Sequence, residues 1–223
     1  MSNHFLRELH KLNQKLLTMG TLVEDRLRQV LQALKTLDGD SAADIIKSDD
    51  NVDEMELAVE EECLKVMALY QPVAIDLRFL VTATRINKDL ERIGDEVVNI
   101  SHRINHMANH EKPVFFYDYS EMGDKTLKML NSSMEALINM DVKLAAKVLR
   151  LDDEVDALQK QAYDTFKIAL GQHANNAAYL LNMFLVSRHL ERIGDLSTNI
   201  CEDVIYMNLG KNVQHKKYSE LEL

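Results

Sequence analysis

A six-residue string containing two acidic residues occurs twice in this sequence. The string Leu-Glu-Arg-Ile-Gly-Asp fills residues 90–95 and returns, unchanged, at residues 190–195. Within each copy the glutamate and the aspartate stand four residues apart, so a helix places both carboxylates on one face. The four acids are Glu91, Asp95, Glu191 and Asp195. Carboxylates are hard oxygen donors, and stacked pairs of them favour a site for Mg²⁺, Mn²⁺, Ca²⁺ or Fe³⁺.

A second pair of aspartates, also four residues apart, precedes each copy of the string. These are Asp49 and Asp53 in the first half, and Asp152 and Asp156 in the second. Residues 53 and 91 lie equally far along the chain from Pro72, as do residues 49 and 95, and the second half shows the same relation about residues 173 and 174. Residues equally distant from the turn of an antiparallel hairpin lie level with each other. Each half is therefore predicted to hold two acidic pairs at one height.

Two amides, Asn99 and Asn199, continue the acidic face one helical turn after each string and are further candidate ligands. A solvated acidic face, neutralised by neighbours such as Lys88 and Arg92, would explain a single pair of acids. A pair that is copied exactly, and matched in height by a second copied pair, favours a cation site. The acids point away from the apolar face of their helix, which predicts ions at the bundle surface rather than in the core.

The elements that carry these acids are predicted to be helices. Apolar residues recur at intervals of three and four, which is typical of helical bundles. The predicted helices are 3–37, 42–70, 74–107, 120–140, 142–170 and 174–207, with a linker at 109–119. The first two helices match the fourth and fifth at an offset of 103 residues. We therefore predict an all-α protein of two tandem antiparallel three-helix bundles related by internal duplication, at residues 1–110 and 111–223.

The composition and the motifs of the sequence disfavour several classes of function. A formal net charge of −10 over 223 residues disfavours nucleic acid as a partner. No segment is apolar enough to span a membrane, and no signal peptide precedes the first helix, which predicts a cytoplasmic protein without membrane insertion. Cys63 and Cys201 are expected to be buried thiols. No motif for an activated nucleophile or a nucleotide-binding loop is present, so the sequence disfavours an enzyme.

The duplicated string, in this context, resembles the PhoU family, the accessory regulators of high-affinity phosphate transport. The resemblance includes Met19-Gly20, the Asp-Asp-x-Val-Asp string at 49–53, and Gln71-Pro72 followed by Asp76-Leu77-Arg78. It implies that the acidic motifs bind multinuclear metal clusters, with iron the first choice and zinc, manganese or magnesium as alternatives. The implied ligands are Glu91, Asp95, Glu191 and Asp195, then Asp49, Asp53, Asp152 and Asp156, then Asn99 and Asn199. The second hairpin lacks the Gln-Pro signature.

The resemblance also implies a function. The protein would be a non-enzymatic negative regulator that binds the phosphate transporter's ATPase subunit and a membrane sensor histidine kinase. It would lower phosphate uptake and the expression of phosphate-starvation genes when phosphate is plentiful. Exposed helical faces suggest a homodimer. Two alternatives remain at this point: a metal store or metal-dependent hydrolase using the surface carboxylates, and a structural helical adaptor without metal.

Overall fold

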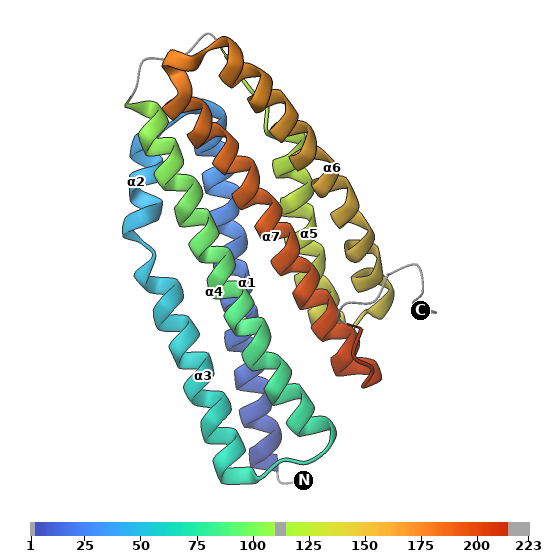
Figure 1. The fold of residues 1–223 in the computed structure, drawn as a ribbon. Coiled ribbons are helices and arrows are strands. Elements are labelled where there is room, and N and C mark those ends of the chain that lie inside the picture. Colours follow the sequence, from blue (N-terminus) through green and yellow to red (C-terminus); the bar gives the residue numbers. More distant parts are fainter. Residues whose placement is uncertain (1–2, 110–114, 214–223) are drawn as a thin grey trace.

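The protein is all-helical in the part of the chain that the structure, a computed structural model, describes, residues 3–109 and 115–213 (Figure 1). The helices are α1 (Asn3–Thr36), α2 (Gly39–Lys47), α3 (Asp50–Tyr70), α4 (Ile75–Ala108), α5 (Ser120–Asn139), α6 (Val142–Gln172) and α7 (Ala177–Leu209), with a 3₁₀ turn at Ala174–Asn176. The predicted fold class is confirmed, because two antiparallel helical bundles, α1–α4 and α5–α7, follow each other in the chain, with α2 and α3 together in the place of one predicted helix. The predicted boundary at residue 110 adjoins residues outside the described part and stays a prediction.

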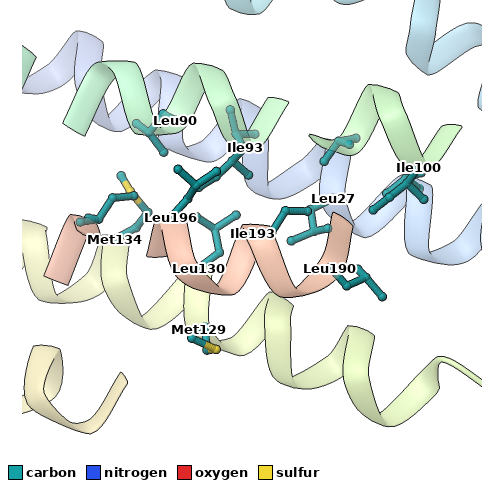
Figure 2. Packing of buried hydrophobic residues seen from close by; sticks show 14 of the residues in the cluster. Leu27, Leu90, Ile93, Ile100, Met129, Leu130, Met134, Leu190, Ile193 and Leu196 are labelled. Carbon is teal, nitrogen blue, oxygen red and sulfur yellow. The ribbon is translucent and has the colours of Figure 1, made fainter. Parts of the chain in front are cut away.

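Helices α4 and α7, which carry the repeated string, lie side by side in the middle of the molecule and run in opposite directions (Figure 1). Helix α3 lies outside α4, and α6 lies outside α7. The apolar residues of the string, Leu90 and Ile93 with Leu190 and Ile193, are fully buried in one continuous core (Figure 2). This core turns the acidic residues of each string away from the centre. No helix in the described residues is both long and apolar enough to cross a membrane.

The two halves also meet through α1 and α5, at two glycines that the sequence repeats. A Cβ atom at Gly123 would lie 2.7 Å from the Leu31 side chain, and one at Gly20 would overlap the end of Met134. Gly20 matches Gly123 at the offset of 103, and Leu31 matches Met134 at the same offset. The two contacts are therefore equivalent, and each glycine allows a helix of one half to approach the other half closely.

The predicted continuous helix over residues 42–70 is wrong. The structure divides it into α2 and α3, with a turn at Ser48–Asp49. The guanidinium of Arg26, on α1, donates a hydrogen bond to the Ser48 carbonyl. In a continuous α-helix this carbonyl would accept its hydrogen bond from the backbone amide four residues later. The second half has Met129 at the position of Arg26, and α6 continues unbroken through the equivalent residues. The helix therefore breaks where the Arg26 side chain contacts its backbone, a contact that the spacing of apolar residues does not predict.

Candidate metal centre

Three aspartates of the second half converge between α6 and α7. Asp152 and Asp156 come from α6, and Asp195 comes from the repeated string in α7. Each offers a carboxylate oxygen, and these oxygens all lie within 4.8 Å of one another. The equal distances of the acidic pairs from the turn of the hairpin predicted that these aspartates would lie level with each other. Such a group of exposed carboxylates can bind a hard metal cation.

Burial and repulsion between neighbouring carboxylates raise the pKa values of the three aspartates. Burial, and then the negative charges of Asp156 and Asp195, raise the pKa of Asp152 to about 7. The Oδ1 atom of Asp152 is buried and has no hydrogen-bond partner in the described residues. Burial and the nearby Asp156 likewise raise the pKa of Asp195. A cation between these groups would offset both the desolvation and the repulsion.

Glu191, the fourth predicted acid of the second half, stands beside the triad. Its Oε1 atom accepts a hydrogen bond of 3.2 Å from Arg188 on the same helix, while its Oε2 atom is buried and unpaired within the described residues. Burial, followed by the charge of Asp195, raises the pKa of Glu191. The glutamate thus has one oxygen available to a ligand at the edge of the triad.

The first half gathers its acids at the equivalent place, but with a different neighbour. Burial and the charge of Asp53 raise the pKa of Asp49, and burial and the charge of Asp95 do so for Glu91. The guanidinium of Arg26 is only 4% exposed and lies 3.4 Å from the Asp49 carboxylate. This arginine supplies the first half with a fixed positive charge. Among the described residues, only the second-half triad satisfies the 4.8 Å spacing.

The difference between the halves follows from one pair of equivalent residues. Met129 replaces Arg26 in the second half, and the end of its side chain and the Oδ1 atom of Asp152 each lie 3.5 Å from the place where a Cβ atom of Gly194 would be. A thioether offers no positive charge to the aspartates, so the nearby positive charges are those of Arg188 and Arg192 on α7. Arg26 is not among the functional residues predicted from the sequence. The signal was available, because the same offset of 103 that aligns the aspartates aligns Arg26 with Met129.

The two predicted amide ligands lie at the contact between α4 and α7, but only one of them bonds across it. The side chain of Asn199, on α7, hydrogen-bonds Asp89 on α4, whereas that of Asn99 hydrogen-bonds Glu96 on its own helix, α4. Glu96 also lies 2.6 Å from His189 and 3.1 Å from Arg192. This polar cluster, likewise absent from the sequence prediction, fixes the two helices that carry the acidic strings relative to each other.

Comparison with known proteins matches both halves to one domain family. The PhoU domain model matches residues 16–104 and again residues 119–204. The phosphate-specific transport system accessory protein PhoU homolog of Clostridium acetobutylicum is 33% identical over 210 residues, which are 94% of this chain and 96% of that protein. The corresponding Escherichia coli protein, PhoU, is 29% identical over 222 residues, covering 100% of this chain and 92% of that one.

Solved structures agree. The crystal structure of PhoU from Pseudomonas aeruginosa superimposes with a TM-score of 0.89 at 33% identity, covering 93% of this chain and all of that one. The phosphate transport system regulatory protein PhoU of Streptococcus pneumoniae gives a TM-score of 0.81 at 27% identity, covering 94% of this chain and 99% of that one. The relatives named here are accessory or regulatory proteins. The chain therefore belongs to the PhoU family, a family of regulatory proteins rather than enzymes.

Proposed function

We propose that this protein is a cytoplasmic negative regulator of phosphate uptake and of phosphate-starvation signalling. Its proposed partners are the ATPase subunit of a phosphate transporter and a membrane sensor histidine kinase, which it contacts as a homodimer. The observation that carries the proposal is the similarity of the whole chain, in both halves, to phosphate transport accessory and regulatory proteins. A rigid pair of bundles suits this role, because it can present different helical faces to two partners.

Deletion of the gene in its own organism tests the regulatory role. We expect phosphate-starvation genes to be expressed in high phosphate, and phosphate uptake to rise, because the negative regulator is missing. Transcript levels and uptake of labelled phosphate measure both effects, and restoring the wild-type gene serves as the control. Unchanged expression and uptake in the deletion strain would refute the proposal.

The metal function proposed for this protein is centred on its second half. Asp152, Asp156 and Asp195, with Glu191 at their edge, are the proposed ligands of a bound cation or a small cluster. Iron is the first choice, and zinc, manganese or magnesium are the alternatives. The unpaired Oδ1 atom of Asp152 supports this assignment. In the first half, Asp49, Asp53, Glu91 and Asp95 form the proposed weaker site, because Arg26 already neutralises part of their charge.

Cation binding at the second-half site is expected to strengthen as the pH rises. Because the pKa of Asp152 is raised to about 7 from 3.8, a proton competes with the cation over this range. Affinity for Mn²⁺ should rise roughly tenfold per pH unit between about pH 5 and 7 if one proton is displaced. Without metal, the stability of the folded protein should instead fall as the pH rises from about 4 to about 7. Over this range Asp152 is ionised in the unfolded chain but keeps its proton in the folded protein, so rising pH favours the unfolded state. Calorimetric titration and thermal melting measure the two trends.

The variant Asp152→Asn tests whether Asp152, and not another group that titrates in the same pH range, causes the pH dependence of Mn²⁺ binding. Asp203, which pairs with Arg85 at 2.9 Å, also has a pKa raised to about 7, mainly by burial. If Asp152 is responsible, the variant should bind Mn²⁺ weakly and without this pH dependence. A pH dependence that survives in the variant would assign it to Asp203 or another group.

A further inference from the structure

Helix α3 exposes two leucines at positions where the duplicated helix carries lysines. Leu57 and Leu64 are 56% and 58% exposed. At the offset of 103 their equivalents in α6 are Lys160 and Lys167, both exposed. Lysine is the ordinary choice for such a surface position, because an exposed leucine leaves apolar area in water. The first half therefore keeps two exposed leucines that the second half shows to be unnecessary for folding.

The comparison of α3 with α6 is secure because their buried residues align at the same offset. Val52 matches Val155, and Val59 matches Ala162, and all four are buried. Cys63 and Val66 match Phe166 and Ala169, which are also buried. The two helices thus present the same faces to their cores, and the leucines lie on the outer face of α3.

Three acidic residues share this outer face with the leucines. Asp50, Glu54, Leu57, Glu61 and Leu64 follow one another at intervals of four and three residues, so they form a single stripe along the helix. We call these five residues the leucine–acid stripe, and all of them are exposed. None of its three acids forms an ion pair within residues 3–109 or 115–213.

The neighbouring charges are already paired, which leaves the stripe acidic. Glu56 accepts from Lys88 at 3.3 Å, and Glu62 lies 2.9 Å from Lys65. On the α1 side the stripe borders an open groove lined in part by Leu22, Met55 and Ala58. The lysines on the far wall of this groove are engaged as well, Lys11 with Glu8 and Lys15 with Glu62. Apolar side chains of a partner have room in the groove, while the free charges of the stripe are negative.

We propose that the leucine–acid stripe docks a helical segment of another protein, with apolar residues at helical spacing flanked by lysine or arginine. The negative charge of the stripe favours a basic partner over the two other candidates, a second copy of this chain and a membrane surface. A second copy of this chain would oppose the same acids, and an anionic membrane surface would repel them. A basic amphipathic helix instead pairs its cations with the acids and covers the leucines. This inference does not depend on the regulatory role proposed above.

A synthetic peptide tests the proposal with the full chain. The probe is a fluorescently labelled amphipathic helix of about 21 residues, with leucines at intervals of three and four and lysine or arginine on both flanks. Fluorescence anisotropy should show saturable binding that weakens with added salt. The double variant Leu57→Lys/Leu64→Lys should bind at least tenfold more weakly. Circular dichroism should show an unchanged fold, since Lys160 and Lys167 occupy the same positions in α6.

Two control variants and a control peptide sharpen the result. Glu54→Gln/Glu61→Gln should weaken the salt dependence, whereas Lys160→Ala/Lys167→Ala should change neither affinity nor salt dependence. A peptide with glutamate in place of its basic residues should not bind. Equal affinity of the wild type and the leucine variant would overturn the proposal. So would equal binding of the acidic peptide, or a wild-type dimer that the leucine substitutions dissociate, because the stripe would then contact a second copy.

Discussion

Replacing both Asp152 and Asp195 with asparagine is expected to lower the affinity for Mn²⁺ by at least about 100-fold, because the change removes two ligand charges from the triad. The same double variant should be more stable than the wild type in the absence of metal, since it relieves the repulsion that raises the pKa of both aspartates. Calorimetric titration with Mn²⁺, and elemental analysis of protein purified without chelator, measure the binding. Thermal melting in chelator measures the stability.

The matched control is the double variant Asp49→Asn/Asp95→Asn in the first half. It removes the equivalent charges from a cluster that already contains the Arg26 guanidinium. We therefore expect the tightest binding event to survive in this variant with nearly unchanged affinity. If both double variants lose binding equally, the two halves share the cation or bind it equally well. The assignment of the stronger site to the second half would then be wrong.

The variant Arg26→Met is expected to give the first half a cation site like that of the second. It removes the buried guanidinium and installs the residue that the duplicated half has at this position, Met129. Asp49 then loses its ion pair at 3.4 Å, so the protein without metal should lose roughly 1–3 kcal/mol of stability. Added Mn²⁺ should restore this loss by binding the folded state. Titration should show about twice as many tight sites as in the wild type.

The reciprocal variant, Met129→Arg, tests the same idea from the other side. At the position equivalent to Arg26, its guanidinium would add a positive charge to those that Arg188 and Arg192 already bring to the triad. We expect tight Mn²⁺ binding to disappear while the three aspartates remain in place. Unchanged numbers of tight sites in both variants would show that residues 26 and 129 do not control cation binding.

Much of this architecture could be predicted because it depends on local spacing and on repetition. Intervals of three and four residues located the helices, and the offset of 103 residues located the duplication. The meeting of Asp152 and Asp156 with Asp195 followed from equal distances to a turn, which needs no knowledge of side-chain contacts. The closeness of these three aspartates was predictable for the same reason as the fold.

The break in the second helix and the inequality of the two acidic clusters could not be predicted in this way. Arg26 contacts both places, because it reaches from α1 to the Ser48 carbonyl at the break and to Asp49 in the acidic cluster. Periodicity places Arg26 on a helix but says nothing of what its long side chain touches.

The paired glycine contacts between α1 and α5 have a consequence for the origin of the chain. Gly20 against Met134 and Gly123 against Leu31 are the two halves of an isologous contact, the kind that a twofold-symmetric dimer makes. A half-length chain with this surface could associate with itself through the same contact, so the two halves are arranged as the subunits of a fused homodimer would be. Fusion freed each copy from the symmetry of a homodimer. An arginine could then settle in one copy and a methionine in the other, so that a single chain came to hold two unlike versions of one ancestral surface.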